Sequence, residues 1–141
     1  MTSMSPYLHF DGNAEKAMNW YKSIFGGTFS LLQRYKDMAG GIKLKDEDRD
    51  RLIHISLQLP GGITLMASDF LSSMETAHVP GNNVHICIQA ENEKEAEILC
   101  KELSTEGSID MPLNKTFWGA YFGMCRDKFN VNWMINCNSA A

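Results

Sequence analysis

Two helical segments with matching start signals lie 79 residues apart in this chain, and strand-like segments flank both in the same order. The first segment follows Asn13 and the second follows Asn92. Asparagine favours this position because its side-chain oxygen accepts a backbone N–H of the first helical turn. Apolar residues then recur at helical spacing: Ala14, Ala17, Met18, Tyr21, Ile24 and Phe25, and later Ala96, Leu99, Cys100 and Leu103. The repeat therefore predicts two copies of one unit, with helices at 14–25 and about 93–106.

The remaining segments alternate apolar and polar residues, which is typical of strands with one face under a helix and one more polar face. The alternation is clearest at 7–10, 52–59 and 84–90, and further strands are predicted at 28–35, 63–68, 108–113, 120–125 and 131–137. Pro60, Gly61 and Gly62 predict a tight turn between two of these strands. The charged segment 36–51 predicts a solvated loop, with a lid over a site as the alternative.

This order of elements predicts an α+β fold in which two tandem βαβββ units form a curled mixed sheet around a cleft. Residues 1–141 are expected to make a single domain of ordinary size. Unit one spans about 4–69, a connector about 70–82, and unit two about 83–138.

Charge and composition exclude several classes of protein. Thirteen Lys and Arg against 17 Asp and Glu give a net charge of -4, which argues against a nucleic-acid binder. Every uninterrupted apolar run is far shorter than the ~20 residues of a membrane helix. The first ten residues lack a signal peptide, so the chain is expected to be cytoplasmic. The four cysteines include no C-x-x-C pair and are expected to be reduced thiols, with a catalytic cysteine as the alternative.

The polar faces of the predicted strands collect residues that a small-molecule site requires. Period-2 alternation places His9, His54 and His85 on these faces. Others of the same parity are Tyr7, Cys87, Gln89, Asn132 and Asn136, and aromatic walls are expected from among Phe117, Trp118 and Trp133. Aromatic walls with a few polar groups are typical of a ligand-binding cleft.

Each of these residues also has a structural interpretation. A histidine on a strand is often a hydrogen-bonded packing residue, and His78 is expected at the surface. Asp69 either orients a histidine or caps the turn after its strand, and Asp127 is expected to form a turn. The strand methionines Met66, Met124 and Met134 are expected to fill gaps in the packing.

Three stretches carry a resemblance to a known family: SPYLHFDGNAEKAMNWY near the start, LIHISL followed by GGITLMASD, and TFWGAYFGMCRDKFNVNWMIN near the end. With these stretches the chain resembles the PhnB-like branch of the vicinal oxygen chelate superfamily, which includes glyoxalase I, bleomycin-resistance proteins and extradiol dioxygenases. The resemblance implies a glyoxalase-like fold. It also implies that His54, at a position where PhnB-like sequences have histidine as well, is the candidate for acid–base chemistry. The chain offers no strand, Gly-rich turn and helix of the kind that a nucleotide-type methyl donor needs.

The resemblance also implies where a divalent metal would bind, because enzymes of this superfamily hold one with four side chains. These positions fall at Ser5 or Pro6, at Leu65 or Met66, at His85, and at Met134. Of these residues only His85 is a competent ligand, and one imidazole does not hold a metal tightly. No cofactor is therefore predicted. The alternative is a non-standard metal site made of His9, His54 and His85.

Three functions follow as hypotheses. The first is a metal-independent homodimer that binds a small molecule, similar to bleomycin-resistance proteins. Its ligand-binding residues would be Tyr7, His9, His54, His85, Trp118, Asn132 and Met134. The second is a lyase, isomerase or dioxygenase of the same superfamily that uses the histidine metal site. The third is a structural or regulatory module that pairs its strand edges with a protein partner. The sequence leaves open whether the protein is an enzyme.

Overall fold

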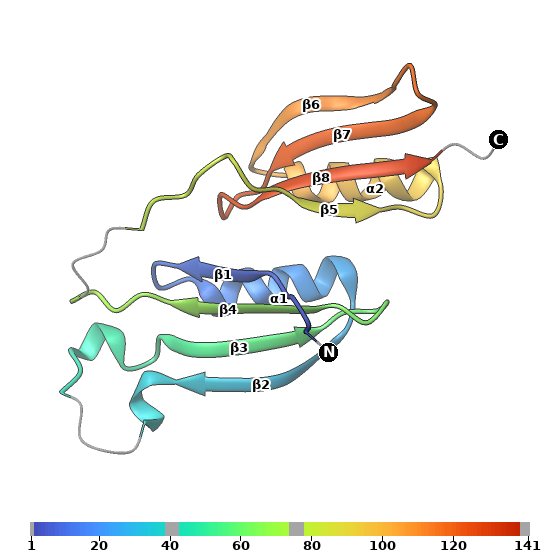
Figure 1. Cartoon of the computed structure of the whole chain (residues 1–141). Helices are drawn as coiled ribbons and strands as arrows, with labels where there is room; N and C mark the ends of the chain where they lie inside the picture. The colour runs from blue at the N-terminus through green and yellow to red at the C-terminus, as the bar shows by residue number, and fades with distance from the viewer. Residues whose placement is uncertain (1, 39–42, 74–77, 139–141) are drawn as a thin grey trace. The chain divides into compact units, whose positions relative to one another are not determined.

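The computed structural model describes residues 2–38, 43–73 and 78–138, which fall into two compact units, Met1–Val79 and Pro80–Ala141 (Figure 1). Each unit contains a strand, a helix and three further strands in that order. The predicted α+β class with two βαβββ units is therefore confirmed. The boundary lies inside the predicted connector. The cleft expected between the units stays a prediction, as does the single domain.

The first unit forms a four-stranded mixed sheet with the strand order β1-β4-β3-β2. Its elements are β1 (Tyr7–Phe10), α1 (Ala14–Phe25), β2 (Thr28–Arg34), β3 (Leu52–Gln58) and β4 (Thr64–Asp69). β1 runs parallel to β4, whereas β3 is antiparallel to both β4 and β2. The predicted Pro-Gly-Gly turn joins β3 to β4, and Gly61 and Gly62 have φ of 92° and 89° there.

The second unit repeats this topology with the strand order β5-β8-β7-β6. Its elements are β5 (Ile86–Gln89), α2 (Glu93–Ser104), β6 (Ser108–Lys115), β7 (Ala120–Arg126) and β8 (Asn132–Asn138). β5 is parallel to β8, and the other neighbours are antiparallel. The helix α2 ends two residues before its predicted end, and Glu106 takes the left-handed backbone conformation with φ of 60°.

In each unit the helix packs on one face of the sheet, and we call the opposite face the open face (Figure 1). The buried residues between α1 and its sheet are Phe10, Ala14, Ala17, Met18, Tyr21, Ile55, Leu57, Leu65 and Ala67. Those between α2 and its sheet are Ala96, Leu99, Cys100, Leu103, Cys125, Trp133, Ile135 and Cys137. Burial of each large apolar side chain contributes about 1.5–3 kcal/mol. Trp133 lies on the helix side, so the expectation of an aromatic wall does not hold for it.

The two helices begin in different ways. The side chain of Asn92 accepts the N–H of Glu95 at 2.8 Å, as predicted. Asn13 is the N-cap residue, as predicted, but its side chain makes no capping hydrogen bond. The carboxylate of Asp69 replaces it and accepts the N–H of Ala14 at 2.9 Å. Asp69 is thus a cap built from the end of β4, and its carboxylate accepts the backbone N–H groups of Gly12, Ala14 and Leu52.

The loop predicted at 36–51 is anchored at both ends by short 3-10 turns, Tyr35–Asp37 and Asp46–Asp48. Asp48 is 1% exposed and accepts both the N–H and the hydroxyl of Ser72. The expectation of a wholly solvated segment is therefore wrong at Asp48. The middle of the predicted lid, residues 39–42, lies outside the described residues.

Two smaller predictions are confirmed. The carboxylate of Asp127 accepts the N–H groups of Phe129 and Val131, and so forms the turn before β8. The four cysteines are free thiols, three of them buried and Cys87 exposed. Among the described residues, no helix is long and apolar enough to cross a membrane.

Candidate functional site

The open face of the first sheet carries a hydrogen-bonded row of three side chains. The hydroxyl of Tyr7 lies 2.8 Å from Nδ1 of His54, and Nε2 of the same ring lies 2.7 Å from the hydroxyl of Ser56. Tyr7 is on β1, whereas His54 and Ser56 occupy alternate positions of β3 and so point to the same side. The strand register brings the two strands together through β4, where Met66 pairs with both Tyr7 and Ser56.

A second contact group adjoins this row. Nδ1 of His9 lies 3.2 Å from the hydroxyl of Ser68, its partner across the parallel β1–β4 pair. The His9 ring stacks on Phe70 with a centroid distance of 5.1 Å and an interplanar angle of 14°, and it lies 5.2 Å from the Tyr7 ring. His78, expected at the surface, is half-buried with its ring 5.9 Å from that of Phe70. We call Tyr7, His9, His54, Ser56 and Ser68 the polar cluster.

The burial of the polar cluster is graded. Ser56 and Ser68 are 6% and 8% exposed, His54 is half-buried, and Tyr7 is 40% exposed. The buried serine hydroxyls therefore contact the two imidazole rings, while the Tyr7 phenol remains accessible to solvent. If Tyr7 donates its hydroxyl proton to Nδ1, then Nε2–H of His54 donates to Ser56. This arrangement can pass a proton between a bound molecule and the imidazole.

The other predicted site residues lie in the second unit. His85 is half-buried just before β5, and Met134 pairs with Cys87 on the open face. Asn132 is 7% exposed, and its amide donates to the carbonyls of Gly81 and Val84 at 2.7 and 3.3 Å. Through these hydrogen bonds Asn132 anchors the segment that leads into β5.

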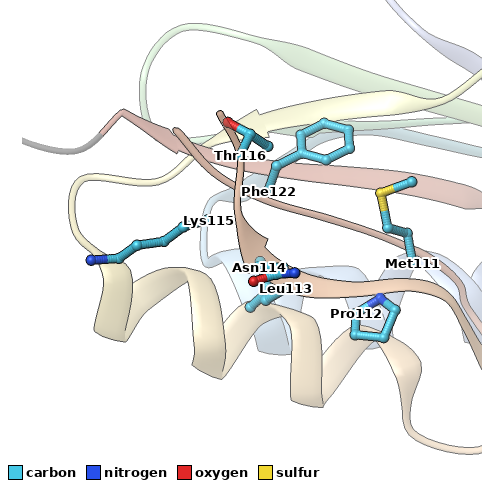
Figure 2. Close-up of a pocket in the computed structure, with 7 residues that line it drawn as sticks. All are labelled: Met111, Pro112, Leu113, Asn114, Lys115, Thr116 and Phe122. Carbon is cyan, nitrogen blue, oxygen red and sulfur yellow. The ribbon is translucent and has the colours of Figure 1, made fainter. Parts of the chain in front are cut away.

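The predicted aromatic residues Phe117 and Trp118 lie at the tip of the β6–β7 hairpin. They are 97% and 62% exposed, and their rings meet edge to face at 4.8 Å. Beside this tip a shallow cavity of about 320 Å³ is lined by Met111, Pro112, Leu113, Asn114, Lys115, Thr116 and Phe122 (Figure 2). Neither Phe117 nor Trp118 is among its lining residues, so the structure does not bring the two predicted aromatic residues into this cavity.

The residues at the expected metal positions do not fit a divalent metal. Pro6, Met66 and Met134 offer no hard oxygen or imidazole donor. Within residues 2–38, 43–73 and 78–138, no group of three or more His, Cys, Asp or Glu side chains could hold an ion. His9 and His54 belong to the first unit, whereas His85 belongs to the second. The alternative histidine site stays a prediction.

Three residues of the site were absent from the prediction: Ser56, Ser68 and Phe70. Ser56 lies two positions after His54 on the same strand and therefore points to the same face, so the alternation could have identified it. Ser68 is tied to His9 by the β1–β4 register, which a single sequence does not reveal. Phe70 comes after the last residue of β4, so the alternation along that strand does not predict where its side chain lies.

Comparisons with known proteins agree with this fold. The family model described as Glyoxalase/Bleomycin resistance protein/Dioxygenase superfamily matches residues 4–135. The crystal structure of protein PA1353 from Pseudomonas aeruginosa is 34% identical with a TM-score of 0.84, and the match covers 98% of both chains. The putative 3-demethylubiquinone-9 3-methyltransferase, PhnB protein, from Bacillus cereus is 28% identical over 96% of this chain and 99% of that chain, with a TM-score of 0.76. Protein YjdN of Escherichia coli strain K12 is 28% identical over 94% of this chain and 93% of its own length. These matches span both units and confirm the resemblance seen in the sequence motifs.

Proposed function

Because this chain belongs to the glyoxalase/bleomycin resistance protein/dioxygenase superfamily, we propose that it binds a small organic molecule on the open face of its first sheet. The proposed binding does not use the divalent metal that the family resemblance implies. The observation that carries the proposal is the hydrogen-bonded row Tyr7–His54–Ser56, whose accessible end is a phenol and whose inner end is a buried hydroxyl.

The chemistry of the polar cluster favours an aromatic molecule with an adjacent hydroxyl or carboxylate. An oxygen of the ligand would exchange a hydrogen bond with the Tyr7 hydroxyl, while its ring packs against the stacked rings of His9 and Phe70. Should the bound molecule react, its proton would move to the Tyr7 oxygen as the phenol proton moves to Nδ1 of His54. The proposed role of His54 is thus that of proton acceptor.

The first test uses salicylate and catechol as probes, followed by amide chemical shifts in nitrogen-15 NMR. We expect saturable shifts gathered at residues 7–9, 54–56 and 68–70. Tyr7→Phe should weaken binding about tenfold, equivalent to ~1.4 kcal/mol, because it removes one hydrogen bond. Tyr121→Phe is the matched control, since that hydroxyl donates to Glu97 in the second unit. Shifts that gather elsewhere, or that are unchanged by Tyr7→Phe, would contradict the proposal.

Metal content of untagged protein separates this proposal from its alternative. Near one equivalent of a divalent metal, lost in His54→Ala, would favour a metal-dependent lyase, isomerase or dioxygenase with a His9, His54 and His85 site. Protein that retains no metal after incubation with Zn²⁺, Ni²⁺, Mn²⁺ or Fe²⁺ would support the metal-independent site. The homodimer implied by the resemblance is likewise proposed, and light scattering over a range of protein concentrations tests it.

A further inference from the structure

The side chain of Arg51 joins three separate segments of the first unit. Its Nη1 atom donates to the backbone carbonyl of Phe70 at 2.6 Å and to Oδ1 of Asp11 at 2.9 Å, and its Nε atom lies 3.4 Å from Oδ1 of Asp48. Only 17% of this side chain is exposed, so these contacts are largely shielded from water. A guanidinium carries five N–H donors in a rigid fork, which lets one side chain bond several acceptors at once.

Residues 69–72 receive further contacts from the chain between β2 and β3. The hydroxyl of Tyr35 donates to the backbone carbonyl of Asp69 at 3.0 Å. The carboxylate of Asp48 accepts the N–H of Ser72 at 3.0 Å and its hydroxyl at 2.7 Å. The guanidinium therefore bonds the middle of a short stretch of chain that is anchored on both sides.

Phe70 is the residue of this stretch that adjoins the polar cluster. Its ring stacks on that of His9 at a centroid distance of 5.1 Å and lies 5.9 Å from the ring of His78. Its N–H donates to the carbonyl of Phe10 at 2.8 Å, and its own carbonyl accepts from Arg51. Because both backbone groups are bonded, the direction of the Cα–Cβ bond is set, and the ring can choose only among its side-chain rotamers.

We propose that Arg51 is a positioning residue of the ligand site, which holds the Phe70 ring against His9 and thereby gives the site its preference for an aromatic ligand. The inference rests on the proposed function, in which the ring of the ligand packs against these two rings. Stacked aromatic rings contribute to binding beyond the area that they bury. Arg51 acts through Phe70 and not on the ligand itself, and its role needs no closing motion because the contacts are already present.

The first measurement needs no ligand. In the wild type, the ring current of Phe70 should shift the carbon-bound protons of the His9 imidazole upfield in proton NMR, and Phe70→Leu should remove this shift. We expect Arg51→Ala to reduce the shift by at least half, because the Phe70 carbonyl loses its donor. The imidazole protons of His54 should stay nearly unchanged, since its ring bonds Tyr7 and Ser56 instead.

The second measurement compares catechol with trans-cyclohexane-1,2-diol, which has two adjacent hydroxyls but no aromatic ring. We expect the wild type to bind catechol at least tenfold more tightly than the diol, and Arg51→Ala to lower this ratio to that of Phe70→Leu. Arg34→Ala is the matched control, because Arg34 makes two hydrogen bonds to Glu15 in the same unit. It should retain both the wild-type ratio and the His9 shift.

A milder variant keeps the test decisive if Arg51→Ala does not fold. Arg51→Lys retains the positive charge but not the fork, so the His9 shift and the probe ratio should both fall below their wild-type values. The proposal is overturned if Arg51→Ala and Arg51→Lys both keep the wild-type shift and ratio, or if Arg34→Ala changes them as much. A wild type that shows no catechol shifts at residues 7–9, 54–56 and 68–70 would overturn the proposed function, and with it the aromatic preference. The His9 shift would still decide whether Arg51 positions Phe70.

Discussion

The Oδ1 atom of Asp69 lies 2.9 Å from the backbone nitrogen of Ala14, so the last residue of β4 caps the first turn of α1. The same oxygen accepts the N–H of Gly12 at 3.0 Å, and Oδ2 accepts the N–H of Leu52 at 2.9 Å. One carboxylate, in a residue 3% exposed, thus joins the start of the helix to the strands on which the polar cluster lies.

Asp69→Ala should therefore destabilise the fold strongly. Three backbone N–H groups would lose their acceptor, and each such loss costs about 1–3 kcal/mol, so we expect a decrease of at least ~3 kcal/mol in the free energy of unfolding. Asn13→Ala is the control, because the Asn13 side chain makes no capping hydrogen bond, and it should cost less than ~0.5 kcal/mol. Urea unfolding followed by circular dichroism measures both. Equal losses would show that Asn13, not Asp69, caps the helix.

Two glycines make the same close approach in the two units. A Cβ atom on Gly27 would overlap the carbonyl oxygen of Gln58, and one on Gly107 would overlap the carbonyl oxygen of Arg126. Gly27→Ala and Gly107→Ala should each cost about 1–3 kcal/mol, because the backbone of the neighbouring strand end must move. Gly81→Ala is the control, since its nearest neighbour would be a side-chain oxygen 3.6 Å away. Thermal unfolding that ranks Gly81→Ala with the other two would contradict this explanation.

The architecture was predictable because two periodicities dominate the sequence. Apolar residues at 3.6-residue spacing located both helices, and alternation located all eight strands to within two residues at their ends. Alternation also put Tyr7, His9 and His54 on one face. It could not show that Tyr7 and His54 bond each other, because that depends on strand register, which is set by turns and cross-strand packing.

The remaining errors concern polar residues whose partners lie far away in sequence. Asn13 has the right residue type for a cap, but the carboxylate of Asp69, 56 residues later, occupies the site. Asp48 belongs to a run of charged residues of the kind usually exposed to solvent. It is nevertheless buried, because Ser72 donates two hydrogen bonds to its carboxylate and Arg51 pairs with it. The residues next to a polar side chain in the sequence do not reveal hydrogen-bond partners that lie far away in the chain.

Asp48 should make stability depend on acidic pH. Burial alone would raise the pKa of this carboxyl, but hydrogen bonds from Ser72 and the charge of Arg51 outweigh it and hold the pKa below the ordinary 3.8. Ionised Asp48 therefore stabilises the folded state above about pH 3.8, and this contribution disappears as the pH falls through the lowered pKa. We expect the free energy of unfolding to fall less steeply below pH 4 in Asp48→Asn than in the wild type. If the free energies of unfolding of the wild type and Asp48→Asn fell in parallel with pH, this assignment would be contradicted. The control is Asp46→Asn, in the same turn.

The four thiols should differ sharply in their reactivity toward iodoacetamide. Cys87 is exposed, whereas Cys100, Cys125 and Cys137 are 6%, 0% and 2% exposed. Burial raises the pKa of Cys125 to about 12, so almost no thiolate is available there at pH 8. Peptide mapping by mass spectrometry after brief labelling at pH 8 should find the label on Cys87 alone.

Two controls make this labelling result informative about the open face of the second sheet. Cys87→Ser should abolish the fast reaction, and labelling in urea should reach the remaining cysteines, because unfolding exposes their sulfur atoms. Fast labelling of Cys137 or Cys125 in the native protein would mean that the helix side of this sheet opens, since both residues lie beneath α2. Protection of Cys87 would mean that something covers the open face, and protection that is lost on dilution would identify a second copy of the chain as the cover.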